Sequence, residues 1–279
     1  MGGSAVADHR AKRVETLPAQ RRAQVLDFVR ERGAATMREL ADGLHASLST
    51  IRRDLELLVE DGYLEKTHGG VLLRQNEPTT FDTDSSLNAH LAWRQKQAIG
   101  AIAALRVSAG DSILCDSSTT VSEVMRHVVA RGIGVTVVTN SLEIASICAP
   151  FPYIKLILPG GTLRSGTASL FGSPGSEFLS TLHVDLCFLG IHSITGNLLT
   201  ETSVEGADAK KIMLKSSRCA ILVADSTKFR LPSFCTVGDI AELDEIITDS
   251  AVTSENRQIC QQSDVTLTIA DITKENPAN

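Results

Sequence analysis

Hydroxyl and guanidinium side chains are concentrated between residues 47 and 53. The stretch SLSTIRR contains Ser47, Ser49, Thr50, Arg52 and Arg53. A guanidinium group can pair with a guanine edge through two hydrogen bonds, and hydroxyls contact bases or phosphates. This chemistry suits a nucleic-acid surface, although an ordinary solvated helix also carries such residues. The elements on either side of the stretch distinguish the two interpretations.

The apolar residues that follow Ser47 recur at helical spacing. Ser47 is a typical N-cap residue, because its oxygen can accept from the free N–H groups of the first turn. The helix that it opens has its hydroxyl and arginine side chains roughly opposite the apolar stripe, near the end that a recognition helix inserts into the major groove. The stripe is formed by Leu48, Ile51, Leu55, Leu58 and Val59.

The surrounding pattern predicts a winged helix-turn-helix. Helices are expected over residues 18–32 and 37–45, the second capped by Thr36. After the recognition helix, residues 63–66 and 71–73 read as two strands joined by a tight turn. The turn brings Lys66, His68, Gly69 and Gly70 to the tip of the wing, where glycine lets backbone N–H groups approach a phosphate.

The remainder of the chain alternates between apolar runs and helical periodicity, which predicts a largely parallel sheet covered on both faces. Strands are expected at residues 112–115, 135–138, 155–158, 186–189, 220–223, 245–247 and 265–269. Helices are expected at residues 94–107, 119–130, 141–149, 205–218 and 254–262.

Polar residues stand just past several of these strands, at the sheet edge where α/β proteins bind ligands. Hydroxyls and free N–H groups at a helix start can hold a phosphate, lysines add positive charge, aspartates can accept sugar hydroxyls, and a glycine pair allows close approach. Such residues are also ordinary helix caps, but several loops that converge favour a ligand site. The candidates are Lys96, Asp116, Ser117, Ser118, Thr119, Thr120, Thr139, Asn140, Ser141, Gly160, Gly161, Lys210, Asp225 and Lys228.

Composition excludes several classes of protein. The net charge is −6, but residues 1–75 hold 12 Lys+Arg against 11 Asp+Glu, so attraction for phosphate must be local. The six cysteines contain no C-x-x-C pair, which favours buried thiols over disulfides or a metal site. No apolar run approaches the ~20 residues of a membrane span, and no signal peptide is evident. We therefore expect a cytoplasmic protein with no metal, no cofactor and no membrane partner.

Two sets of motifs carry a family resemblance. The runs TIRRDLELL and DGYLEKTHGGV resemble the N-terminal signature of the DeoR family of bacterial transcriptional regulators, over about residues 20–73. The elements DSSTT, VVTNS, LPGG, LGIHSI and ADSTKF look like the effector-binding domain of the same family, which is similar in fold to ribose-5-phosphate isomerase. One departure is His45-Ala46, where the family usually has Gly-Val.

The resemblance implies an organisation and a function. A DNA-binding domain would span residues 18–75, a polar linker 76–93 and an α/β effector domain 94–272. The chain would be a repressor that binds operator DNA through Ser49, Thr50, Arg52 and Arg53 under the control of a phosphorylated sugar or related metabolite. Asp54 is expected to orient an arginine or to pack locally. A protein with one DNA-binding domain per chain is also expected to form a dimer or tetramer.

An enzyme remains the alternative. An aldose-ketose isomerase needs a carboxylate base beside its substrate, whereas the segment after the glycine pair, GGTLR, contains none. No catalytic residue is therefore predicted. A dinucleotide-binding domain is disfavoured, because no G-x-G-x-x-G follows the first strand of the sheet.

Overall fold

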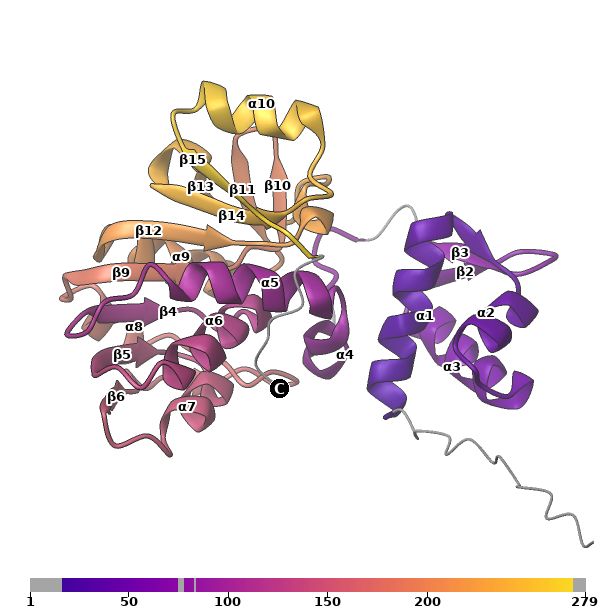
Figure 1. Ribbon diagram of the computed structural model, residues 1–279, viewed down its shortest axis with the longest axis horizontal. Helices are drawn as coiled ribbons and strands as arrows, with labels where there is room; N and C mark the ends of the chain where they lie inside the picture. Colours follow the sequence, from indigo (N-terminus) through magenta and orange to yellow (C-terminus); the bar gives the residue numbers. More distant parts are fainter. Residues whose placement is uncertain (1–16, 75–77, 83, 273–279) are drawn as a thin grey trace, which may run out of the picture. The chain divides into compact units, whose positions relative to one another are not determined.

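The first 74 residues and the rest of the chain fold as two separate units, Met1–Arg74 and Gln75–Asn279 (Figure 1). The computed structural model describes residues 17–74, 78–82 and 84–272. Residues 76, 77 and 83 of the expected linker, and residue 75 of the expected first domain, lie outside these ranges.

The first unit is a winged helix-turn-helix, as predicted. Its three strands form one antiparallel sheet in the order β1-β3-β2. Apolar side chains from all three helices are fully buried between them, which holds this small unit together. The elements are α1 (Pro18–Arg32), β1 (Ala34–Ala35), α2 (Met37–Gly43), α3 (Leu48–Glu60), β2 (Leu64–Lys66) and β3 (Val71–Leu73).

The apolar stripe predicted for the recognition helix α3 is confirmed at most of its positions. Ile51, Leu55 and Leu58 are buried, and Val59 is half-buried. Leu48 is 50% exposed, contrary to the prediction, because it is the first residue of α3 and extends past the small core. The two-residue strand β1 was too short to show a period in the sequence.

The second unit is built on a seven-stranded parallel sheet in the order β15-β14-β12-β9-β4-β5-β6. These strands are the seven expected from the sequence, with ends that shift by up to three residues. They are β4 (Ser112–Cys115), β5 (Val135–Thr139), β6 (Ile154–Ile157), β9 (Val184–Leu189), β12 (Ser217–Val223), β14 (Glu245–Asp249) and β15 (Thr266–Ala270).

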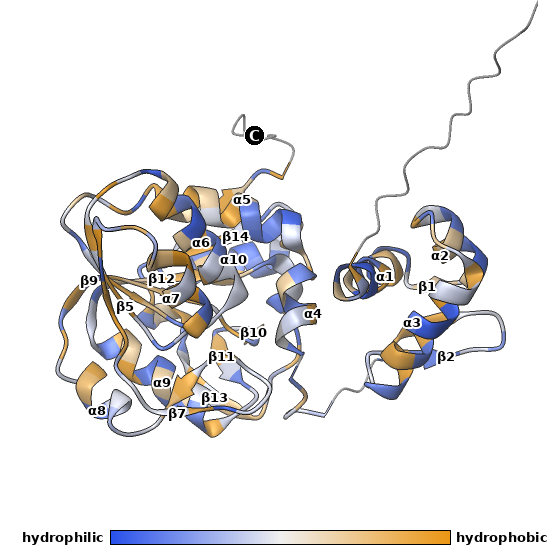
Figure 2. Ribbon diagram, turned by 90° about the horizontal axis from the view of Figure 1, so that it is seen from below, coloured by the Kyte–Doolittle hydropathy of each residue, from blue (hydrophilic) through white to orange (hydrophobic). Residues whose placement is uncertain are grey.

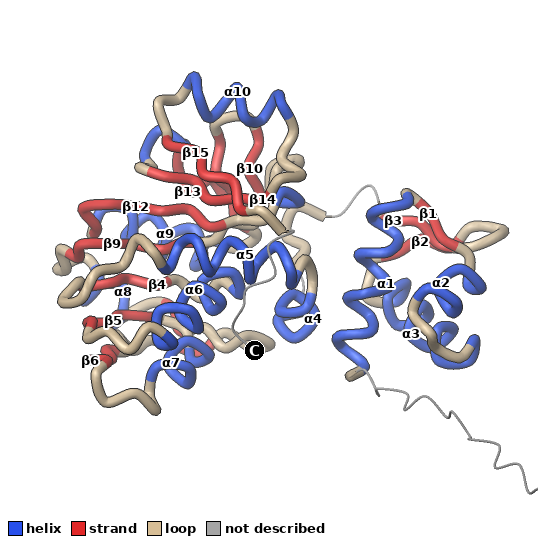
Figure 3. The backbone as a smooth tube through the Cα atoms, viewed as in Figure 1, coloured by secondary structure: helices blue, strands red, loops and turns tan. Residues whose placement is uncertain are grey.

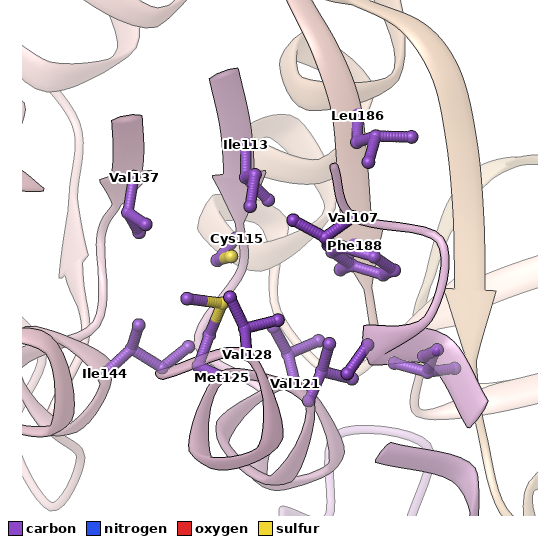
Figure 4. Close-up of a cluster of buried hydrophobic side chains, with 14 of the residues drawn as sticks. Val107, Ile113, Cys115, Val121, Met125, Val128, Val137, Ile144, Leu186 and Phe188 are labelled. Carbon is purple, nitrogen blue, oxygen red and sulfur yellow. The ribbon is translucent and has the colours of Figure 1, made fainter. Parts of the chain in front are cut away.

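Both faces of this sheet are buried. Ile113 and Cys115 point into one apolar cluster, while Leu114 between them points into the other. The first cluster, shown in Figure 4, includes Met125 of α6 and Ile144 of α7. The central strands are accordingly among the most hydrophobic parts of the chain (Figure 2). The helices are α4 (Ser85–His90), α5 (Trp93–Ala104), α6 (Thr119–Ala130), α7 (Leu142–Cys148), α8 (Gly175–Leu179), α9 (Val204–Lys215) and α10 (Ser254–Gln262).

Strand β4 marks the point where the order of the sheet reverses. The chain runs outward from β4 through β5 to β6, then returns to β9 on the other side of β4 and continues through β12. Loops after neighbouring strands diverge at such a point, which opens a crevice at their carboxyl ends. The topology therefore predicts a ligand site beside the end of β4.

Short antiparallel strands complete the unit (Figure 3). A three-stranded sheet has the order β10-β11-β13, and a two-stranded one pairs β7 with β8. The sequence analysis did not identify them, because strands of two to five residues with polar positions show no clear period. They are β7 (Thr162–Leu163), β8 (Leu170–Phe171), β10 (Ser193–Thr195), β11 (Leu198–Glu201) and β13 (Cys235–Asp239), with 3₁₀ helices η1 (Ser226–Lys228) and η2 (Ile240–Glu242).

The stretch expected as a linker contains regular structure. Helix α4 begins after Asp84, whose carboxylate accepts from the backbone N–H groups of Ser86 and Leu87. Leu87 is buried, and α4 packs against α6 of the second unit. The sequence predicted a hinge here instead of a helix, because α4 has only about one and a half turns and is too short to show a sustained apolar period.

Candidate functional site

The first residues of α3 form a cluster of exposed hydroxyl groups. Ser47 caps the helix, since its Oγ accepts from the backbone N–H of Thr50 at 3.1 Å. The same oxygen lies 2.9 Å from Ser49 Oγ and 2.8 Å from Thr50 Oγ1. The helix N-terminus and these hydroxyls together offer donors to a phosphate or a base edge.

Arg52 and Arg53 are both exposed, and neither forms an ion pair with a residue that the structure describes. The neighbouring Asp54 is only 3% exposed and pairs with Arg21 of α1, with Nε–Oδ2 at 2.5 Å. The expectation that Asp54 orients an arginine or packs locally is thus confirmed. Because Arg21 neutralises this carboxylate inside the unit, the guanidinium groups of α3 remain available to an outside partner.

The wing glycines have different roles. A Cβ at Gly70 would lie 2.2 Å from the carbonyl oxygen of Ala35, so glycine is needed there for strand packing. Its N–H donates to Thr67 Oγ1 at 3.1 Å and is not directed outward. Gly69 has open space around it, and Lys66 and His68 beside it are exposed. A hollow of about 380 Å³ lies between α3 and the wing, lined by Arg52, Glu56 and these wing residues among others.

In the second unit, a cavity of about 150 Å³ lies where the sheet order reverses, at the carboxyl ends of β4, β5, β9 and β12. Ten of the fourteen predicted ligand residues line it. They are Lys96, Asp116, Ser117, Ser118, Thr119, Thr120, Asn140, Ser141, Lys210 and Lys228.

Four of the predicted residues do not line this cavity. Thr139 is fully buried, and its Oγ1 accepts from the N–H of Ser141. Asp225 is buried and caps η1 by accepting from the N–H of Thr227. Among the glycines, a Cβ on Gly161 would lie 2.7 Å from the carbonyl oxygen of Phe171, whereas a Cβ on Gly160 would meet only Pro174, at 3.7 Å. Gly161 therefore allows close approach of the chain's own backbone, while Gly160 provides a backbone conformation with φ = 85°.

A buried charge network forms the floor of the cavity. Lys210 Nζ bonds to Asp116 Oδ2 and lies 3.4 Å from Glu201 Oε1. Burial lowers the pKa of Lys210, but the two carboxylates outweigh it and the net pKa is raised, so the ammonium stays charged. Asp116 also accepts from the N–H groups of Ser118 and Gly190, at 2.8 and 2.9 Å. Most of its capacity is thus used in joining β4, β9 and α9, rather than left for a sugar hydroxyl.

The start of α6 offers donors to the cavity. Ser118 caps the helix by accepting from the N–H of Thr120. The hydroxyls of Ser117 and Thr119 line the cavity and bond to no residue that the structure describes. A 12-residue helix concentrates partial positive charge at this end.

Asn140 presents an acceptor that lacks a partner. It is only 3% exposed, and its Nδ2 donates to the carbonyl oxygen of Leu170 at 3.1 Å. That bond fixes the orientation of the amide, because only the nitrogen can donate. Its Oδ1 is buried without a partner within the described part of the chain, which is costly unless a ligand or water donates to it.

Other lining residues come from segments that the sequence analysis did not include. Arg164 and Thr167 belong to the β7–β8 hairpin, and Glu201 ends β11. Burial raises the pKa of Glu201, more than Lys210 lowers it. An arginine three residues after the glycine pair was the one signal available for Arg164, whereas nothing in the sequence marked Glu201.

His192 also lines the cavity and is neutral. Burial, and then the positive charges of Arg230, Lys228 and Lys210, lower its pKa to about 2. Arg230 Nη2 lies 2.5 Å from His192 Nε2. Since a guanidinium can only donate, Nε2 accepts and the ring proton is on Nδ1.

Comparison with protein families identifies both units. The family described as the DeoR-like helix-turn-helix domain matches residues 21–77, and the DeoR C terminal sensor domain matches residues 92–250. The chain belongs to the DeoR family. The sensor-domain match contains the whole lining of the cavity except Asp82 and Asn88.

Relatives of this DeoR-family chain are similar over most of their length. The HTH-type transcriptional repressor GlcR of Bacillus subtilis (strain 168) is 31% identical, over 82% of this chain and 88% of the relative. The HTH-type transcriptional regulator GlpR of Haloferax volcanii is 30% identical, with 90% and 97% covered. The glycerol-3-phosphate regulon repressor of Escherichia coli (strain K12) is 29% identical, with 83% and 90% covered.

Solved structures resemble the DeoR-family chain less closely. Ribose 5-phosphate isomerase A from Methanocaldococcus jannaschii has a TM-score of 0.36 and 16% identity, over 48% of this chain and 53% of the isomerase. A likeness at this level says nothing about activity. None of the described helices is both long and apolar enough to cross a membrane.

Proposed function

We propose that this DeoR-family chain is a transcriptional repressor whose operator binding is controlled by a phosphorylated sugar or related metabolite bound in the second unit. The observation that supports the proposal is the lining of the cavity. It includes Ser117 and Thr119, whose hydroxyls bond to no described residue, and Asn140, whose buried Oδ1 has no partner among the described residues. A ligand with an anionic group and a hydroxyl group matches both features.

We expect different residues of the cavity to contact different parts of such an effector. Ser117, Thr119 and the first N–H groups of α6 bind the phosphate, with positive charge from Lys228 and Arg164. A hydroxyl of the effector donates to Asn140 Oδ1. Asp116, Lys96 and Lys210 act mainly by holding the walls of the cavity in place, because their charged groups are already bonded within the protein.

The first unit binds the operator. Ser47, Ser49, Thr50, Arg52 and Arg53 face the DNA from α3. Lys66, His68, Gly69 and Gly70 belong to the wing, where Lys66 and His68 contact phosphates. The described part of the chain has one such surface, so the protein works in the cytoplasm as a homo-oligomer that brings at least two recognition helices to a symmetric operator.

Arg53→Ala tests whether the recognition helix α3 binds the operator. Genomic fragments selected in vitro by the protein supply the operator probe. We expect the variant to lose about 1–3 kcal/mol of binding free energy at fixed salt. Arg218→Ala is the control, because Arg218 is also an exposed arginine but belongs to the second unit, where it pairs with Asp185. Equal affinities of the two variants would refute this assignment.

Thr119→Ala tests the phosphate site. A thermal-shift screen of phosphorylated sugars should find a stabiliser of the unvaried protein, worth ~2.7 kcal/mol at a hundredfold excess over Kd. The shift should be lost in Thr119→Ala and kept in Ser254→Ala. Both residues are the first of a helix that follows a strand of the main sheet, but Ser254 lies outside the cavity. A shift that survives in both variants would place the ligand elsewhere.

An isomerase is the second candidate, because the cavity contains a carboxylate that the glycine-rich segment lacks. Glu201 lines the cavity with a raised pKa, as a general base would. The ion pair with Lys210 favours a structural role for this carboxylate instead. Turnover of pentose or hexose phosphates that disappears in Glu201→Gln would establish the enzyme, and its absence would leave the regulator.

A further inference from the structure

The segment that joins the two units is part of the second unit. This connecting segment, residues 79–82 and 84–92, begins five residues after Arg74, the last residue of the DNA-binding unit. The N–H of Phe234 donates to the carbonyl oxygen of Thr79 at 3.1 Å, and Lys96 Nζ bonds to the carbonyl oxygen of Asn88. Leu87 is buried in the second unit. These contacts attach the connecting segment to the α/β domain.

The connecting segment also forms part of the cavity wall. Asp82 and Asn88 both line the cavity in which the effector is proposed to bind. A ligand in this cavity would therefore lie against side chains of the connecting segment, which leads to the DNA-binding unit. The sheet and its helices need not move for the two sites to communicate.

Arg164 connects the cavity to this segment. Its Nη2 lies 3.2 Å from Asp82 Oδ2, and its Nη1 donates to Ser203 Oγ at 3.2 Å. Both charged side chains of the pair are more than a third exposed, and such a pair contributes little to stability. A phosphate competes well for the same guanidinium, because it carries more charge than a carboxylate and can equally accept two parallel hydrogen bonds.

Electrostatic repulsion between an anionic ligand and Asp82 would also favour release of the connecting segment. The negative charge of Asp82 already contributes to the raised pKa of Glu201, which places the two carboxylates within electrostatic range of each other. An anionic ligand added to this cavity would repel Asp82 while it attracts Arg164. The ligand therefore has different interaction energies with the two arrangements of the connecting segment, as a conformational switch requires.

We infer that Arg164 is the switch residue of this repressor: it holds Asp82 of the connecting segment without effector, and it pairs with the effector's phosphate when the effector binds. The exchange releases the connecting segment from the cavity wall and changes the freedom of the DNA-binding unit. The inference rests on the proposed function, since it needs an anion in the cavity.

Asp82→Asn in the full-length chain tests the switch, with Glu143→Gln as a matched control. Glu143 also lines the cavity, and its side chain is 37% exposed against 39% for Asp82. It pairs with a different arginine, Arg126, at 3.3 Å. Each variant removes one negative charge from the cavity, but only Asp82→Asn breaks the contact with the connecting segment.

Hydrogen exchange of the backbone amides of residues 79–92 is the first measurement. Without ligand, these amides should exchange faster in Asp82→Asn than in the unvaried protein or in Glu143→Gln. Glycerol 3-phosphate and inorganic phosphate are the probes, with glycerol as the uncharged comparison. Each anion should speed exchange in the unvaried protein and in Glu143→Gln, with little further change in Asp82→Asn.

Affinity for the same probes is the second measurement. Asp82→Asn should bind them up to about fivefold more tightly than Glu143→Gln, because it removes a competitor worth at most about that factor. The difference should vanish when Arg164→Gln is added to both variants, whereas a through-space charge effect would persist.

The outcomes separate the inference from the proposed function. Identical behaviour of Asp82→Asn and Glu143→Gln, or slower exchange of residues 79–92 on anion binding, refutes the switch and leaves the effector site intact. If neither anion binds the unvaried protein, the proposed anion site is refuted and the switch with it.

Discussion

Replacement of Lys210 by methionine tests whether the charge network is the framework of the cavity. Methionine keeps much of the volume of the lysine stem but leaves Asp116 and Glu201 without their common cation. The Asp116 side chain is 2% exposed and that of Lys210 11%, so solvent can do little to replace the lost partner. Removal of one member of a buried pair costs about 3–5 kcal/mol.

This loss is large enough to measure by two methods. For a folded unit of about 200 residues, each kcal/mol lowers Tm by roughly 2–4 °C, so the expected fall is roughly 6–20 °C. Urea unfolding followed by circular dichroism gives the free energy itself. Lys211→Met is the control, because Lys211 is the next residue, 45% exposed and 3.7 Å from the exposed Asp208. It should change stability by no more than about 0.5 kcal/mol.

The effect should also depend on pH in a defined direction. Burial raises the pKa of Glu201, and loss of Lys210 removes the main contribution that lowers it. A carboxyl with a raised folded-state pKa contributes stability below its unfolded pKa and loses it as pH rises through the folded pKa. The destabilisation by Lys210→Met should therefore be greater at pH 8 than at pH 5. A loss within 1 kcal/mol of the control, or a larger loss at pH 5, would refute this account of the network.

Two further predictions concern the DNA-binding unit. Gly70→Ala should destabilise it by about 1–3 kcal/mol, since the added Cβ would lie 2.2 Å from the Ala35 carbonyl oxygen, whereas Gly69→Ala should be nearly neutral because the space is open. Equal urea midpoints for these variants would contradict the packing argument. His45→Gly should stabilise the unit by roughly 0.5–1 kcal/mol, because His45 has φ = 52°, where a side chain is strained by about 1–2 kcal/mol, and glycine recovers most of this. A lower Tm for His45→Gly would show that the side chain contributes more than its backbone strain costs.

Local patterns in the sequence determined the secondary structure and much of the fold. Helices at residues 18–32, 119–130 and 254–262 and the strand at 112–115 begin and end where they were predicted. Capping residues such as Ser47 and Ser118 mark helix starts by bonding to backbone a few positions away, so their signal lies within a short window. Alternating or periodic apolar residues act over the same range. The order of the strands in the main sheet was not predicted and came only from the tertiary structure.

The site was predicted only as far as loop convergence allows. Polar residues after β4, β5 and β12 meet at one cavity because parallel strands end at one edge. Asp116 and Lys210, 94 residues apart, were both candidates, but their bond to each other could not be inferred. Nor could the sequence show that Gly161 lies against the backbone of Phe171, since the residue type is the same whether a ligand or the chain itself lies beside it.

Residue types and local spacing thus predicted a recognition helix and a polar sheet edge in this chain. Only the tertiary structure decided which polar groups are already used within the protein and which remain for a ligand. It also joined the β7–β8 hairpin and the connecting segment to the cavity through Arg164 and Asp82. The physical reason is that these polar groups bond to residues far away in the sequence. Which groups meet depends on how the whole chain packs and cannot be read from any single window of residues.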